Sequence, residues 1–257
     1  MRMTAAKREN FFIIVGNQRC GTNYLRDIFM RQTNIYPYGE VFFPDVNITH
    51  NFDGHFFTFY REMIAQDKYN IFFNNPDIFD GLFERYVSEI IKFSPREKSC
   101  FDVKSDCFIN VPRLYECIKN LDIKVLHLYR RDKIGRALSQ AVLHQSFSAE
   151  NGFNPTRHNA GDVISVDKDA VYRNILAADG FDEFVRKRYS DEQRLSVCYE
   201  DLIAESSSWE SIRSFLRFEG DILPQKAFAK RQGLGAVSRV ANHNEIIEYL
   251  ASKGISD

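Results

Sequence analysis

Residues 11–30 of the chain read FFIIVGNQRCGTNYLRDIFM, and this stretch decides the fold. The apolar run Phe11–Val15 predicts a buried strand, and a glycine-bounded turn follows it at residues 16–22. The apolar side chains of the next segment recur with helical spacing at Leu25, Ile28 and Phe29. Glycines let backbone N–H groups approach an anion, and the start of a helix adds unpaired N–H donors. The stretch therefore predicts a strand, an anion-binding loop and a helix.

The loop differs from the phosphate loop of ATP- and GTP-binding proteins in the position of its cation. That loop carries a lysine directly after its second glycine. Here Thr22 follows Gly21, and the basic residue is Arg19, which precedes this glycine. Thr22 and Asn23 can cap the helix or donate to a phosphate. The alternative is an ordinary turn between a strand and a helix that happens to carry an arginine.

Length and composition limit the classes to which the chain can belong. Its 257 residues suit one α/β domain, and a formal net charge of −1 argues against nucleic acid or an anionic membrane as partner. The cysteines are odd in number and lack the paired spacing of a metal site, so we expect reduced thiols and no metal. The polar N-terminal segment and the lack of an apolar run of about 18 residues predict a soluble, cytoplasmic protein.

Three further strands are predicted at residues 99–105, 123–129 and 195–199. Lys104 lies near the end of the first, and the second runs into the charged segment Arg130–Lys133. Segments with helical spacing separate the strands, so we expect an α/β, P-loop-like fold with a mostly parallel central sheet and helices on both faces. Because such sheets bind ligands beyond the carboxyl ends of their strands, these cations are candidate site residues.

Two segments interrupt the alternation, and we expect both on the side of an acceptor substrate. Residues 44–80 are rich in Phe, Asn and Asp and predict an irregular insertion, whereas residues 147–166 predict an exposed, turn-rich loop. No Gly/Ser-rich linker sets either apart, so residues 1–257 are predicted to form a single domain. Glu40, between Gly39 and an apolar run, is either an exposed edge residue or a desolvated functional acid.

Several short segments, in this order, are similar to motifs of one enzyme family. They are Arg19–Leu25 (RCGTNYL), Gly39-Glu40, Arg131 with Ser139 eight residues later, Tyr199–Leu202 (YEDL), Lys230–Gln232 (KRQ), and Asn242 with Glu245. Together they resemble the sulfotransferases that use 3′-phosphoadenosine 5′-phosphosulfate (PAPS). The bacterial carbohydrate branch, which includes trehalose 2-sulfotransferase and the nodulation-factor sulfotransferase, is the most similar. The resemblance covers nearly the whole chain.

The resemblance implies a role for each site residue. The 5′-phosphosulfate would be held by the loop residues Arg19, Cys20, Gly21, Thr22 and Asn23. Lys104 would lie near the sulfuryl group, and Glu40 would accept the proton of the acceptor hydroxyl. The 3′-phosphate would be bound by Arg131 and Ser139, with help from Lys230 or Arg231.

The activity that the resemblance implies is transfer of a sulfuryl group from PAPS to a hydroxyl of a carbohydrate or glycolipid, without a metal. A homodimer is expected by analogy with the trehalose enzyme. The chain departs from the family pattern at Cys20 and Asn23, where serine or threonine is commoner. The strand that carries Lys104 also lacks the K-T-H sequence of the animal cytosolic enzymes, so no histidine base is expected there.

The sequence leaves two other functions open. A P-loop kinase or NTPase is disfavoured because no lysine follows Gly21, although Tyr199–Asp201 offers an acidic strand end for a metal. The other is a nucleotide- or glycan-binding relative without catalytic activity. It is disfavoured because the candidate residues occur together, namely Arg19, Glu40, Lys104, Arg131 and Ser139.

Overall fold

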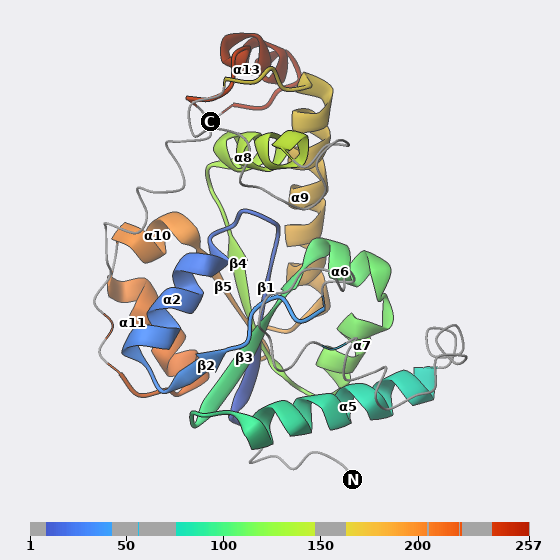
Figure 1. Ribbon diagram of the computed structural model, residues 1–257, viewed down its shortest axis with the longest axis vertical. Helices are drawn as coiled ribbons and strands as arrows, with labels where there is room; N and C mark the ends of the chain where they lie inside the picture. The colour runs from blue at the N-terminus through green and yellow to red at the C-terminus, as the bar shows by residue number, and fades with distance from the viewer. Residues whose placement is uncertain are drawn as a thin grey trace.

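The computed structural model describes residues 9–42, 56, 76–146, 163–204, 206–220, 222 and 238–256. Within this part, five strands form one sheet in the order β2-β3-β1-β4-β5 (Figure 1). The strands are β1 Phe11–Gly16, β2 Ile35–Pro37, β3 Lys98–Lys104, β4 Lys124–Tyr129 and β5 Arg194–Cys198. Every pairing between neighbouring strands is parallel. All carboxyl ends of the strands therefore meet at one edge of the sheet.

Helices cover both faces of this sheet (Figure 1). The helices of the described part are α2 Thr22–Gln32, α5 Pro76–Phe93, α6 Ser105–Asn110, α7 Arg113–Asn120, α8 Lys133–Ser146, α9 Lys168–Arg188, α10 Tyr199–Ala204, α11 Ser206–Leu216 and α13 His243–Ser252. The buried side chains of β1 alternate: Phe11 and Ile13 pack toward α5 and α7, whereas Phe12 and Ile14 pack toward α2 and α11. This arrangement confirms the predicted fold class.

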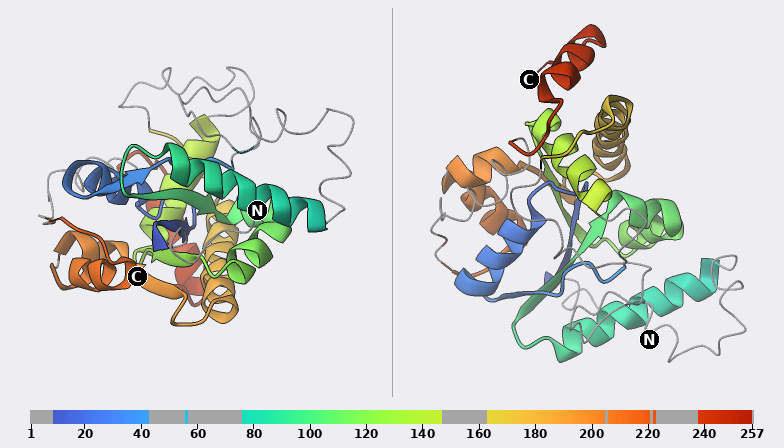
Figure 2. Two further views of the ribbon diagram at one scale, coloured as in Figure 1. Left: turned by 90° about the horizontal axis from the view of Figure 1, so that it is seen from below. Right: turned by 45° about the horizontal axis from the view of Figure 1, so that its top comes forward.

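A third apolar cluster lies beyond the sheet and joins α8, α9 and α13. Figure 2 shows α13 next to α8 and α9 at one end of the molecule. The backbone of Ile164 pairs with Val240, which ties the segment before α9 to the segment before α13. None of the helices in the described ranges is long and apolar enough to cross a membrane.

The predicted elements differ from the observed ones mainly at their ends. Ser105 begins α6 and Tyr199 begins α10, although the sequence predicts both in the preceding strands. Residues 76–80, assigned to the insertion, belong to α5, because its apolar stripe already starts at Phe79. The rest of residues 44–80 lies outside the described part except for Phe56, whose ring stacks on Phe42 with the centroids 4.4 Å apart. Residues 147–162 of the predicted loop also lie outside it.

Arg96 secures the helix that follows the anion-binding loop. Its guanidinium donates to four carbonyl groups at and beyond the end of α2, those of Phe29, Met30, Thr33 and Ile35. The last carbonyls of a helix have no partner within it, and a cation suits this negative end of the helix dipole. The contact fixes α2 against the sheet and so positions the loop at its other end.

Candidate active site

The loop after β1 has a shape that only glycine allows at two positions. A Cβ atom on Gly21, whose φ is 99°, would lie 2.1 Å from a ring carbon of Tyr199. A Cβ atom on Gly16 would lie 2.6 Å from the carbonyl oxygen of Leu128 in β4. Arg19 also adopts a left-handed conformation, with a φ of 64°. The backbone is thus held in a tight turn that ends at the first residue of α2.

The start of the loop is anchored to α9. Asn17 donates from Nδ2 to the Asp182 carboxylate at 2.9 Å and to the Ala178 carbonyl at 3.2 Å. The same Asp182 oxygen lies 3.1 Å from Nε2 of His127, whose Nδ1 is 3.0 Å from the Ser196 hydroxyl. His127 has no exposed surface. It is a satisfied core histidine that supports the loop through Asp182, so it is not a candidate ligand.

Lys104, the last residue of β3, lies beneath the other end of the loop. Its Nζ donates to the Thr22 hydroxyl at 2.5 Å and lies 3.7 Å from Glu40 Oε1 and 3.9 Å from Asp102 Oδ2. Only 1% of the side chain is exposed. Burial by itself lowers the pKa of Lys104, but Cys20, Asp102 and Glu40 together outweigh burial, and its pKa is raised. The amine is therefore a fixed positive charge.

Backbone pairing with β3 brings Glu40 to this lysine. Tyr38 N donates to the Cys100 carbonyl at 2.8 Å, and Asp102 N donates to the Gly39 carbonyl at 2.7 Å. The segment after β2 thus continues along β3 toward its carboxyl end. The Glu40 side chain is 30% exposed, whereas the residues on both sides of the Gly39-Glu40 pair are buried. The carboxylate is therefore open to a substrate on one side.

Two carboxyl groups near Lys104 were not singled out from the sequence. Asp102 is fully buried within β3, and Asp106 lies in the first turn of α6. Burial raises the pKa of each of these carboxyl groups. A charged residue between Phe101 and Val103 in a buried strand was the available signal for Asp102.

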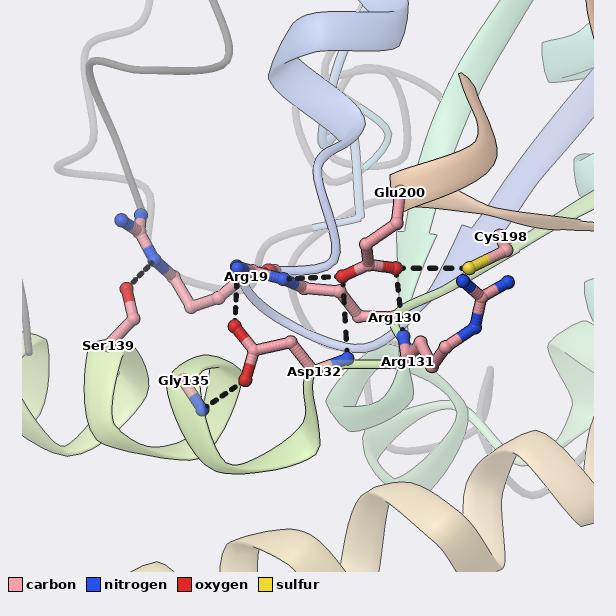
Figure 3. A network of polar contacts seen from close by, with 8 residues as sticks. All are labelled: Arg19, Arg130, Arg131, Asp132, Gly135, Ser139, Cys198 and Glu200. Atoms are coloured by element: carbon pink, nitrogen blue, oxygen red, sulfur yellow. Dashed lines mark hydrogen bonds and ion pairs between the residues drawn. The ribbon is translucent and has the colours of Figure 1, made fainter. Parts of the chain in front are cut away.

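Arg19 and Ser139 meet across the loop, although they are far apart in the sequence. Arg19 Nε donates to Ser139 Oγ at 3.0 Å (Figure 3). Ser139 lies on α8 and is buried. The pKa of Arg19 is lowered, first by burial and then by the neighbouring charge of Arg130, with Glu40 acting in the opposite direction. A guanidinium held between a hydroxyl and a phosphate-type loop can bind an anion.

Arg131 does not join this pair. Its guanidinium donates to both oxygens of Asp201, at 2.8 and 3.0 Å, and 67% of its side chain is exposed. Its backbone N–H donates to Glu200 Oε2 at 2.9 Å. Figure 3 shows the Arg131 side chain directed away from Ser139. The structure thus places the two residues predicted to share the 3′-phosphate at neighbouring elements, with their side chains apart.

Arg130 lies between the Arg19–Ser139 pair and the Arg131 side chain (Figure 3). It donates from Nη1 to the Arg19 carbonyl at 3.4 Å, from Nε to Glu200 at 3.3 Å and from Nη2 to Asp132 at 3.0 Å. Asp132 also accepts from the Gly135 N–H at 2.6 Å and so caps the start of α8. Arg130 therefore links the loop to the end of β4.

The remaining predicted residues contribute less to the observed arrangement. Cys20 is buried under the loop, and burial raises the pKa of its thiol. Asn23 is exposed, and its Oδ1 accepts from Arg26 at 3.4 Å rather than capping α2. Lys230 and Arg231 lie outside the described residues. Within the described part, no group of three or more His, Cys, Asp and Glu side chains could hold a metal ion.

The architecture is that of a P-loop-like α/β protein, and among such proteins it has the sulfotransferase fold. A solved sulfotransferase domain from the curacin biosynthetic pathway has a TM-score of 0.52 at 12% identity, over 98% of this chain and 99% of that chain. A sulfotransferase from Alicyclobacillus acidocaldarius has a TM-score of 0.46 at 16% identity, over 95% of this chain and 94% of that chain. Mouse sulfotransferase SULT7A1 complexed with PAP has a TM-score of 0.42 at 15% identity, over 90% and 65% of the two chains. No family model and no curated protein matches the chain.

Proposed function

We propose that this protein transfers a sulfuryl group from PAPS to a hydroxyl of a carbohydrate or glycolipid. The observation that supports the proposal most is the group formed by Lys104, Thr22 and Glu40 at the loop of a chain with the sulfotransferase fold. A fixed cation, a hydroxyl and an accessible carboxylate meet where a phosphosulfate would end. These are the groups that transfer to an alcohol requires.

Sulfuryl transfer parallels phosphoryl transfer, in which a loose, in-line transition state leaves the protein mainly to position the reactants and stabilise charge. Arg19 and the amides of Gly21 and Thr22 would hold the 5′-phosphate and neutralise its bridging oxygen as the S–O bond breaks. The buried Lys104 ammonium would stabilise the transferring group, because electrostatic attraction is stronger where water is excluded.

Glu40 would act as general base. In the described structure it faces Lys104 and is partly open to solvent, so that it can exchange this ion pair for the hydroxyl of an acceptor. It would take the hydroxyl proton as the new S–O bond forms. General bases contribute about 10²- to 10⁴-fold to a rate. The assignment of a carbohydrate or glycolipid acceptor rests on the similarity of Gly39-Glu40 to the bacterial carbohydrate branch.

The 3′-phosphate would be bound by Ser139 and Arg131, with Lys230 or Arg231 as further cations. For this, Arg131 must exchange Asp201 for the phosphate. An exposed ion pair is worth only about 0–1 kcal/mol, so a doubly charged phosphate competes well for the guanidinium. Ser139 already faces Arg19 and requires no such exchange.

Calorimetric titration with adenosine 3′,5′-bisphosphate (PAP), the desulfated product, tests the proposal without knowledge of the acceptor. ADP serves as the control, and magnesium is left out. We expect PAP to bind with a Kd in the micromolar range, about −8 kcal/mol, and ADP to bind much more weakly. Preference for ADP, or a requirement for magnesium, would instead identify a P-loop kinase or NTPase.

The acceptor class requires a second experiment. PAPS labelled in its sulfuryl group is incubated with the protein and a panel of neutral sugars, glycolipids, phenols and simple alcohols. Label is expected in a sugar or glycolipid. Transfer to phenols alone would contradict the carbohydrate assignment, and tight PAP binding without transfer to any panel member would favour a non-catalytic relative.

A further inference from the structure

The Asp102 carboxylate is fully buried within β3. It has no exposed surface, and the groups that act against its burial are Lys104, Arg26 and the Thr22 hydroxyl. Its Oδ2 lies 3.9 Å from Lys104 Nζ and 3.9 Å from Arg26 Nη1. A buried carboxylate normally has hydrogen-bonded partners, because taking its charge out of water is unfavourable. A pair of apolar side chains would serve the strand at least as well.

Lys104 therefore has two carboxylate partners of different character. Glu40 is 30% exposed and follows Gly39, which has a φ of 89°. Asp102 is enclosed within the sheet and cannot leave the lysine. The proposed reaction requires Glu40 to turn from Lys104 to the acceptor hydroxyl and then to carry a proton. At that moment Glu40 no longer compensates the buried ammonium.

We propose that Asp102 is a positioning residue that keeps the Lys104 ammonium charged and in place beneath the phosphate loop while Glu40 is released for proton transfer. This inference rests on the proposed function, because it assigns Asp102 to the same site. Arg26, on the second turn of α2, holds Asp102 from the other side. Thr22, which accepts from Lys104, completes the arrangement.

The charged and titratable groups around Lys104 predict the direction in which its pKa changes when Asp102 is replaced. They come from the loop, β3, the segment after β2, and α6, and they are Cys20, Asp102, Glu40, Asp106 and Cys107. Burial disfavours the ammonium, but Cys20, Asp102, Glu40 and Cys107 act in the opposite direction, and the pKa of Lys104 is raised. Asp102→Asn removes one of them and leaves burial in place. The pKa of Lys104 must then fall.

The experiment is the pH dependence of PAP affinity, which needs no acceptor. Calorimetric titrations are made from about pH 7 to about pH 10, where the phosphates stay fully ionised. A protonated Lys104 attracts the 5′-phosphate, so affinity is present below its pKa and is lost above it. Wild-type affinity is expected to stay nearly constant over this range. The Asp102→Asn variant is expected to lose about tenfold or more toward the basic end, one pKa unit being a factor of ten.

Two controls separate this effect from a structural one. Asp27→Asn removes the carboxylate of a different ion pair on α2, that with Arg31, and is expected to follow the wild type. Lys104→Met is expected to bind PAP weakly at every pH, and adding Asp102→Asn to it should introduce no new pH dependence. If Asp102→Asn does not fold, Asp102→Ser, in which water can fill the site, carries the same expectation.

The outcomes distinguish the inference from the proposed function. A wild-type protein that does not bind PAP overturns both. A wild type that binds PAP, with an Asp102 variant that keeps the same flat profile, overturns the inference and leaves the proposed function intact. A loss of affinity toward basic pH that persists in the Lys104→Met background also overturns it, because the titrating group is then not Lys104.

Discussion

Lys104 at the end of β3 and Arg131 just after β4 are both cations at the carboxyl edge of the sheet, but their surroundings differ. Lys104 has 1% of its side chain exposed and faces a carboxylate, Asp102, that has none. Arg131 has 67% of its side chain exposed, and Asp201, its partner, has 33%. One ion pair is part of the core, and the other lies in water.

This difference decides what each cation can do. Removing one partner of a buried pair leaves an uncompensated charge and destabilises by about 3–5 kcal/mol, so the position of Lys104 is fixed. An exposed pair contributes about 0–1 kcal/mol and exchanges readily. In the proposed mechanism, the fixed charge lies at the transferring group, where preorganisation matters, and the exchangeable one meets the part of the nucleotide that only has to bind.

Glu40→Gln, at the site of the fixed cation Lys104, should produce the largest effect of the four changes, a loss of turnover. PAP affinity stays near the wild-type value, because the nucleotide contacts remain, whereas turnover on the identified acceptor falls by about 10²-fold or more. Steady-state kinetics and calorimetry measure the two quantities. Glu89→Gln, on the exposed side of α5, is the matched control. Normal turnover in the Glu40 variant would remove this residue from the mechanism.

Gly21→Ala should disrupt the anion-binding loop above Lys104 by changing its backbone. The added Cβ would lie 2.1 Å from the Tyr199 ring at a φ of 99°, so that the loop must change shape. We expect PAP affinity to fall by about 10²-fold, as expected when charge-assisted contacts worth about 1.5–3 kcal/mol each are misplaced. Gly180→Ala, in the middle of α9 with no atom within 4 Å of the new Cβ, is the control. It should bind PAP normally and raise the thermal midpoint, and equal affinity in both variants would show that the loop does not hold the nucleotide.

Arg131→Ala removes the exchangeable cation and should have an intermediate effect on PAP affinity. The variant loses one charged contact to the 3′-phosphate, so PAP affinity should fall about tenfold while affinity for adenosine 5′-phosphosulfate, which lacks this phosphate, does not change. Calorimetry with the two ligands gives the ratio. An equal loss for both ligands, or no loss for either, would contradict the assignment.

Asp201→Asn should change PAP affinity the least, and it should raise the affinity instead of lowering it. Without the competing carboxylate, Arg131 is available to the phosphate, and PAP affinity should rise by at most about fivefold, the equivalent of about 1 kcal/mol. The gain should shrink at high salt, because exposed ion pairs are screened. A lower affinity would mean that the pair with Asp201 holds Arg131 in its binding position, and the distinction between fixed and exchangeable cations would not hold.

The central part of the fold was predictable from local patterns. The apolar run Phe11–Val15 and the largely apolar segment Ile123–Tyr129 predict buried strands, and β1 and β4 are indeed adjacent and parallel. The glycines of the loop and Arg19 predict an anion site from the sequence alone. The position of Lys104 beside Glu40 was expected only by resemblance. It depends on the backbone pairing of Gly39 with β3, which no local pattern shows.

Other features depend on contacts that are distant in the sequence. Pro37 ends β2, a three-residue edge strand whose sequence reads as a turn. The partner of Arg131 is Asp201, which lies in α10 just after β5, so no spacing along the chain indicates it. The burial of Asp102 follows from packing of β3 between β1 and β2. In each case the tertiary arrangement determines the environment of the side chain.

The contacts that shape the loop have a consequence for the order in which the protein folds. The loop follows β1, but Asp182 holds Asn17, and the Tyr199 ring packs on Gly21. Synthesis proceeds from the N-terminus, and contacts between distant segments form late. A growing chain that has exposed only β1 and α2 therefore lacks the partners of its own loop. Affinity for the proposed nucleotide would then arise only once β5 has joined the sheet, so that the ligand would stabilise the finished protein without guiding the earlier steps.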